Sequence, residues 1–161
     1  MSDSTFIVGQ SLPRIGLEDK VVGRALYTAD IRLPGMLHAK ILRSPHPHAK
    51  ILSVDITKAI QMVGVLGVFT PFDPEASRLI APDMAVLDTV VRFVGDEVAV
   101  VVAETEDIAE LALGLLGVEY RVLPYVLDPK EALQSDSVQV HPHGNLWDGK
   151  PMILERGDVE S

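Results

Sequence analysis

The fold class is decided by residues 97–122, EVAVVVAETEDIAELALGLLGVEYRV. The uninterrupted apolar run Val98–Val102 predicts a strand that is buried on both faces. Thr105 is a good helix N-cap, acidic residues follow it in the first turn, and apolar residues recur at helical spacing until Gly117. Val118–Val122 alternates like a second strand. A strand, a helix and a strand in this order predict an α/β fold with one main crossover helix.

Shorter elements are expected on both sides of this unit. Residues 36–43 alternate imperfectly between apolar and polar side chains, which is typical of a strand, and residues 44–48 form a loop because they contain two prolines. The further expected elements are a strand over 49–55, a short helix over 57–62, a strand over 65–70, a long surface loop over 71–86, a short strand over 90–93 and a helical turn over 128–133.

The length of 161 residues suits one compact domain with extensions. Residues 1–22 keep no regular period and are expected to form an extended N-terminal arm. Residues 23–140 hold the predicted elements and are expected to form the domain. Periodicity is lost again afterwards, so residues 141–161 are expected to be an irregular linker.

The composition excludes several classes of function. The net charge is −9 and the pI about 4.9, which oppose nonspecific binding to nucleic acid and to anionic membranes. The absence of cysteine excludes disulfides, thiolate zinc sites and cysteine-ligated iron–sulfur clusters. No run reaches the roughly 18 apolar residues of a membrane span, and the polar start lacks the features of a signal peptide. A cytoplasmic protein is expected.

The histidines are candidate metal ligands. His46 and His48 form one pair, His141 and His143 form a second, and His38 stands alone. Two close pairs could build a tetrahedral zinc site. However, pairs in proline-interrupted loops do not converge on one point by themselves, so the sequence favours histidines on loop surfaces and predicts no metal site.

Other patterns also fail to indicate catalysis or cofactor binding. There is no nucleophile-elbow motif around a serine, and Gly114 and Gly117 lie inside or at the end of an amphipathic helix rather than in a phosphate-binding loop. Adjacent acids are expected to be solvated rather than catalytic. The acid pairs are Glu18-Asp19, Asp96-Glu97 and Glu106-Asp107.

The segment Gly23–His48 combines closely spaced glycines and prolines with Tyr27 and charged residues, but with no catalytic set. Polar loops fixed by such turn residues often bind a neighbouring domain. The residues expected at a domain or subunit contact are Arg43, Ser44, His46 and His48.

Several blocks of the sequence resemble the opening of the large, molybdenum-binding subunit in the xanthine dehydrogenase and aldehyde oxidase family. The first blocks are GRALYTADI at 23–31, LPGMLHA at 33–39 and LRSPHPHAKI at 42–51. VGDEVAVVVA at 94–103, VEY at 118–120, LP at 123–124, DP at 128–129 and AL at 132–133 continue the pattern, and RGDVE at 156–160 resembles the segment leading into the cofactor-binding region.

The resemblance implies an α/β-hammerhead fold, in which a small mixed sheet carries a β-hammerhead hairpin motif. It also implies a molybdenum hydroxylase that hydroxylates an aldehyde or N-heterocycle carbon with oxygen from water. The complete enzyme would hold a molybdenum–pterin cofactor, two [2Fe-2S] clusters and usually FAD. The family's catalytic and pterin-binding residues lie in later domains, so none is carried over to a position of this chain.

Two interpretations follow from the resemblance. In the first, the chain is a structural N-terminal domain that supports assembly of the cofactor-bearing domains and is inactive alone. Its partners would be the molybdopterin-binding domain and the iron–sulfur and flavin domains or subunits. In the second, it is a stand-alone binding or scaffold module that reuses the hammerhead fold. The substrate of a complete enzyme is left open.

Overall fold

The computed structural model describes residues 9–76, 78–81, 84–154 and 156–157. The chain divides into two compact units, one ending at Met36 and the other beginning at Leu37. Within the described residues, no helix is long and apolar enough to span a membrane. The predicted arm before residue 9 and most of the RGDVE block lie outside the described residues.

The first unit has little structure of its own. It contains the one-turn helix α1 (Leu17–Val21) and the 3-10 helix η1 (Thr28–Asp30), so the segment predicted as an extended arm includes a short helix. The Asp30 carboxylate accepts a hydrogen bond from the Tyr27 N–H at 2.9 Å and fixes the second turn. No residue between 9 and 36 is buried. This unit therefore forms local turns without a hydrophobic core.

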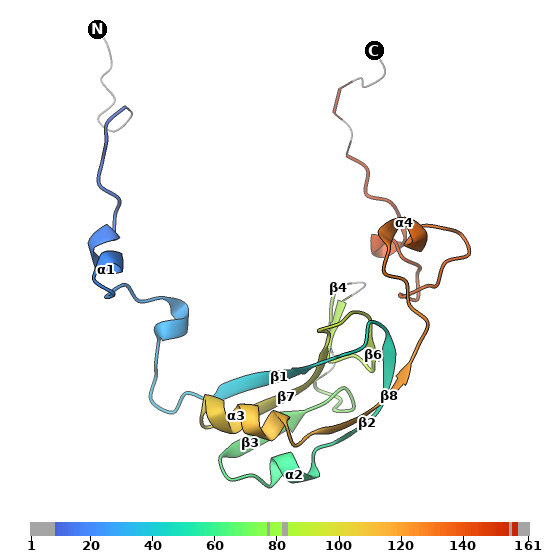
Figure 1. The fold of residues 1–161 in the computed structure, drawn as a ribbon, viewed down its shortest axis with the longest axis horizontal. Coiled ribbons are helices and arrows are strands. Elements are labelled where there is room, and N and C mark those ends of the chain that lie inside the picture. The colour runs from blue at the N-terminus through green and yellow to red at the C-terminus, as the bar shows by residue number, and fades with distance from the viewer. Residues whose placement is uncertain (1–8, 77, 82–83, 155, 158–161) are drawn as a thin grey trace. The chain divides into compact units, whose positions relative to one another are not determined.

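The second unit contains three small sheets, in which every described strand pairing is antiparallel (Figure 1). The order in the first sheet is β1-β7-β3, in the second β6-β2-β8, and in the third β4-β5. Their bounds are β1 His38–Arg43, β2 Ala49–Asp55, β3 Val65–Phe69, β4 Arg78–Ala81, β5 Met84–Val86, β6 Val90–Val91, β7 Glu97–Ala103 and β8 Gly117–Val122. The helices are α2 Thr57–Ile60, α3 Glu106–Leu113 and α4 Pro129–Ala132, with a 3-10 helix η2 at Trp147–Gly149.

Strand β7 lies at the centre of the fold because it contributes to both core clusters. Val98 packs with Ala49, Ile51 and Val91, which joins the first sheet to the second. Val101 belongs to the other cluster, whose further buried members are Ala59, Val68 and Ala112. Adjacent strand residues point to opposite faces, so the prediction that this strand is buried on both faces is confirmed.

Helix α3 begins as the sequence predicts, since the Thr105 hydroxyl accepts a hydrogen bond from the Ile108 N–H. The helix contacts β1, β7 and β3 and covers one face of their sheet (Figure 1). Ala109 and Ala112 are its buried residues. Their small side chains allow close packing against the sheet.

The predicted crossover helix is present as α3, and the two strands that it joins, β7 and β8, belong to different sheets. Helix α3 carries the chain from the first sheet to the second. The apolar run of β7 revealed burial on both faces, but antiparallel neighbours covered by a helix and a second sheet produce the same pattern as a parallel strand. The prediction of a mixed α/β architecture with one main helix is confirmed.

The long loop predicted over 71–86 is wrong in part, because β4 and β5 form an antiparallel pair within it. Pro71 and Pro74 lie before the pair rather than inside it. The prolines hid these two short strands from pattern reading, since strands of three or four residues carry almost no periodic signal.

Candidate functional site

The loop after β1 is held against the turn before β7. The Ser44 N–H donates to the Asp96 carbonyl and the Gly95 N–H donates to the Ser44 carbonyl, each at 2.8 Å. The Ser44 hydroxyl accepts from the His46 N–H at 3.0 Å, and the side chain is only 3% exposed. Ser44 therefore fixes the conformation of its own loop.

The two histidines of this loop differ in exposure. His48 is 6% exposed, and its Nδ1 lies 2.6 Å from the Pro124 carbonyl oxygen. A carbonyl only accepts, so this nitrogen carries the proton. His46 is half-buried and meets the Tyr120 ring edge-on, with 4.9 Å between the ring centroids. The prediction of surface histidines is wrong for His48, which ties the loop to the segment after β8.

Arg43 is the most exposed of the predicted contact residues. Its Nη1 donates to the Gly95 carbonyl at 2.7 Å and pairs with the Glu97 carboxylate at 3.1 Å. The contact role predicted for Arg43, Ser44, His46 and His48 stays a prediction. Arg43 and Ser44 bond to the β6–β7 turn. His46 contacts Tyr120 of β8 and His48 bonds to the segment after β8. Ser44 and His48 are buried.

The other histidines do not join this region into a metal site. His38 and His141 are half-buried and His143 is exposed. In the described part of the chain, no group of three or more His, Asp or Glu side chains is placed to hold a metal ion. The chain also has no cysteine thiolate for a [2Fe-2S] cluster. The residues present therefore do not fit that cluster, and no redox step is assigned to them.

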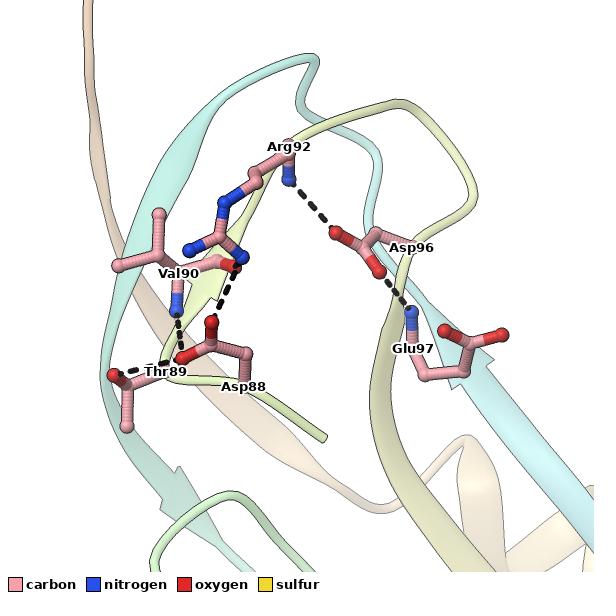
Figure 2. A network of polar contacts seen from close by, with 6 residues as sticks. All are labelled: Asp88, Thr89, Val90, Arg92, Asp96 and Glu97. Carbon is pink, nitrogen blue, oxygen red and sulfur yellow. Dashed lines mark hydrogen bonds and ion pairs between the residues drawn. The ribbon is translucent and has the colours of Figure 1, made fainter. Parts of the chain in front are cut away.

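A polar network surrounds the turn between β6 and β7 (Figure 2). The Arg92 Nη1 donates to the Asp88 carboxylate at 2.7 Å and to the Val90 carbonyl at 3.0 Å. Asp96 lies on the other side of the Arg92 backbone and accepts from the N–H groups of Arg92 and Glu97, at 2.8 and 3.0 Å. Asp96 thus closes the turn, whereas the sequence pattern predicts a solvated acid pair at this position.

The pKa values of Asp88 and Asp96 are shifted in opposite directions. Burial acts most strongly on Asp88 and would raise its pKa, but the ion pair and hydrogen bond with Arg92 outweigh it, so the pKa is lowered. Burial also dominates at Asp96, where backbone hydrogen bonds only partly offset it, and the pKa is raised. The difference arises because the guanidinium pairs with Asp88 and leaves Asp96 without a directly bonded counter-ion among the described residues.

A cleft of about 430 Å³ opens beside this network. Its walls come from the β6–β7 turn and from residues 141–147, and Ala85 of β5 also lines it. Phe93 and Trp147 line it and are 56% and 62% exposed. The remaining lining residues are Arg92, Asp96, Glu97, His141, Asn145 and Leu146. This lining combines apolar surface with two carboxylates and one guanidinium, which suits binding rather than covalent chemistry.

Asn145 holds the second wall in place. Its side-chain oxygen accepts from the Val140 N–H at 2.9 Å, and its amide donates to the carbonyls of Ala132 and Val138 at 2.9 and 2.8 Å. All of these groups belong to α4 or to the segment that follows it. Sequence reasoning missed Asn145 because its pattern indicates only a turn. It also missed Asp88 and Arg92, whose four-residue separation was the available signal.

Comparison with known proteins identifies the family. The family model described as "Aldehyde oxidase and xanthine dehydrogenase, a/b hammerhead domain" matches residues 22–124. The chain is 44% identical over 145 residues to a probable xanthine dehydrogenase subunit of Bacillus subtilis, covering 88% of this chain and 19% of that protein. It is 34% identical to the nicotinate dehydrogenase large molybdopterin subunit of Eubacterium barkeri, covering 96% of this chain and 37% of that protein.

Solved structures agree with these relatives. The quinoline 2-oxidoreductase from Pseudomonas putida 86 superposes with a TM-score of 0.75 at 37% identity, covering 85% of this chain and 19% of that one. This chain therefore spans only 19–37% of the length of these relatives. It belongs to the aldehyde oxidase and xanthine dehydrogenase family, contains that family's α/β hammerhead domain, and corresponds to part of a molybdenum hydroxylase large subunit.

Proposed function

We propose that this chain is the structural N-terminal domain of the molybdenum-bearing subunit of a molybdenum hydroxylase. It supports assembly of the cofactor-bearing domains and has no turnover alone. Its partners are the molybdopterin-binding domain and the iron–sulfur and flavin domains or subunits. The molybdenum–pterin, [2Fe-2S] and flavin groups belong to those partners. The expected division into an arm over 1–22, a domain over 23–140 and a linker over 141–161 is part of this proposal.

The observation that carries the proposal is the exposed apolar surface of the first unit. Ile15 is 99% exposed and Leu26 is 81% exposed, and no residue between 9 and 36 is buried. Large apolar side chains without a core gain free energy when a neighbour covers them, at about 25 cal/mol for each Å² buried. Met152 and Leu154, which are 92% and 96% exposed, extend the same pattern to the C-terminal segment.

Arg43 supplies the polar part of the expected contact. Its guanidinium is half-exposed, and its Nη1 already binds Gly95 and Glu97, so the head group is held in one place on the surface. A fixed, partly exposed guanidinium binds a carboxylate or carbonyl of a neighbour at a small entropic cost.

The test is assembly of the complete enzyme. Ile15→Asp is compared with the conservative variant Ile15→Val, and Leu26→Asp with Leu26→Met. Arg43→Ala is compared with Lys58→Ala, at an exposed lysine of α2. We expect the aspartate variants and Arg43→Ala to reduce the amount of the other components that co-purifies with this chain, and the matched controls to leave it unchanged.

Unchanged co-purification of every variant would contradict the assembly role and favour a stand-alone binding module. Turnover of aldehydes or N-heterocycles by the isolated chain would contradict the other half of the proposal. The co-purification measurement requires no knowledge of the substrate of the complete enzyme.

A further inference from the structure

The cleft between the β6–β7 turn and residues 141–147 has an uneven charge balance. Two of its three formally charged lining residues are already paired: Arg92 with Asp88 at 2.7 Å, and Glu97 with Arg43 at 3.1 Å. Asp96 accepts only from backbone N–H groups in the described structure. Among the described lining residues, one carboxylate is therefore left without a bonded cation.

The apolar part of the lining includes two exposed aromatic rings. Phe93 and Trp147 contribute one exposed ring from each wall. Exposed aromatic faces attract cations, and the planar guanidinium of arginine both stacks on a ring and pairs with a carboxylate. The cleft thus presents the two features that an arginine side chain binds.

We infer that this cleft is a docking site for an arginine side chain presented by an extended segment of another protein component. The unpaired Asp96 carboxylate and the two exposed aromatic rings carry the inference. Anionic ligands such as nucleotides are disfavoured, because the two carboxylates of the lining, Asp96 and Glu97, outnumber its one guanidinium, Arg92, which already pairs with Asp88.

The charge of the Asp96 carboxylate is only partly compensated, because Arg92 acts on it through space without a hydrogen bond. Its pKa is raised mainly by burial, so an incoming cation would relieve a cost that the empty cleft carries. The wall opposite is held by the three hydrogen bonds of Asn145, so the cleft exists before the arginine arrives.

This inference deepens the proposed function by giving the chemistry of a contact, and it rests on that proposal only for where the partner segment comes from. Its test uses the full 161-residue chain alone, so the two can fail separately. If the peptide does not bind, the proposal that the first unit supports assembly is unaffected. If assembly is unaffected by the variants of the first unit, the inferred peptide binding is still tested separately.

The chain contains a single tryptophan, Trp147, and this residue lines the cleft. Its fluorescence therefore reports on the proposed site directly. The probe is the peptide acetyl-Ala-Arg-Leu-amide, and the matched probe is acetyl-Ala-citrulline-Leu-amide, which keeps the shape of the side chain and removes its charge. We expect a saturable fluorescence change with the arginine peptide that weakens as salt is added, and roughly tenfold weaker binding of the citrulline peptide.

Two variants locate the binding. Asp96→Asn removes the charge of the carboxylate. Phe93→Leu removes one aromatic face and leaves the backbone hydrogen bonds of Asp96 intact. Each variant is expected to bind the arginine peptide several-fold more weakly. Asp136→Asn, an exposed aspartate away from the cleft lining, is expected to bind like the unmodified chain. Circular dichroism checks that each variant is folded.

Equal binding of the arginine and citrulline peptides would overturn the inference, as would the absence of saturable binding. Unchanged binding by a folded Phe93→Leu variant would overturn it as well. If Asp96→Asn does not fold, the peptide pair and Phe93→Leu still decide the question.

Discussion

Asn145→Ala tests whether one side chain holds the wall of the cleft. The half-buried amide makes three hydrogen bonds, to Val140, Ala132 and Val138, and alanine makes none of them. Each hydrogen bond contributes a net free energy of about 1 kcal/mol, so the variant stabilises the segment that follows α4 against local opening by about 3 kcal/mol less. This corresponds to a change of roughly 100-fold in the opening equilibrium.

Native-state hydrogen exchange measures this change directly. The Val140 amide donates to Asn145, so its exchange should accelerate by roughly 100-fold in the variant. Amides of β7, which lie in the core, should exchange as before. Gln139→Ala, at an exposed neighbouring position, is the control. A Val140 exchange rate within about threefold of the unmodified chain would refute the reasoning, because the three bonds would then contribute little to local stability.

Three further predictions concern the core, a turn and the polar network. Val101→Ala should lower the free energy of unfolding by about 2 kcal/mol in a urea titration, because Val101 is fully buried. Leu66→Ala, at a 55% exposed position, should change it by less than about 0.5 kcal/mol, and similar losses at both sites would contradict the assigned core. Gly64→Ala should lower the melting temperature more than Gly95→Ala. Both glycines have positive φ, but only at Gly64 does the new Cβ meet another side chain, at 2.7 Å from Ile108 Cδ1. Equal shifts in melting temperature would show that the clash is relieved. Asp88→Asn should destabilise the chain at neutral pH, and the difference in the free energy of unfolding from the unmodified chain should vanish as the pH falls. The folded-state pKa of Asp88 is lowered below 3.8, so its contribution to stability is present above pH 3.8 and is lost below it. Unfolding measured as a function of pH checks this. A difference that persisted through that range would argue against the Arg92 pair as its source.

Most of the secondary structure could be predicted from local patterns. The strand at 49–55 matches the expected range, and the strand at 97–103 contains the predicted run at 98–102. The N-cap of α3 is the predicted Thr105, and α4 lies within the turn expected over 128–133. These elements carry a long apolar run or a capping residue, which are local signals. The β4–β5 pair carries neither and was missed.

The candidate site was much less predictable. Asp96 lies next to Glu97 in the sequence and was expected to be solvated, but its role depends on two backbone N–H groups and on a guanidinium that turns away from it. His48 was expected at the surface, but its ring reaches the Pro124 carbonyl, 76 positions later in the chain. Such partners are brought together by folding and leave no periodic trace.

The sequence alone determined the mixed α/β class, the family, and the burial on both faces of the strand at Val98–Val102. The apolar run that predicts burial and the motifs that identify the family are both local patterns of consecutive residues. The tertiary structure decided how that strand is used. It pairs β7 antiparallel with β1 and β3, and it places β8 in a second sheet. The physical reason is that an apolar run specifies how much surface must be covered, while the identity and direction of the covering strands depend on contacts between segments far apart in the chain.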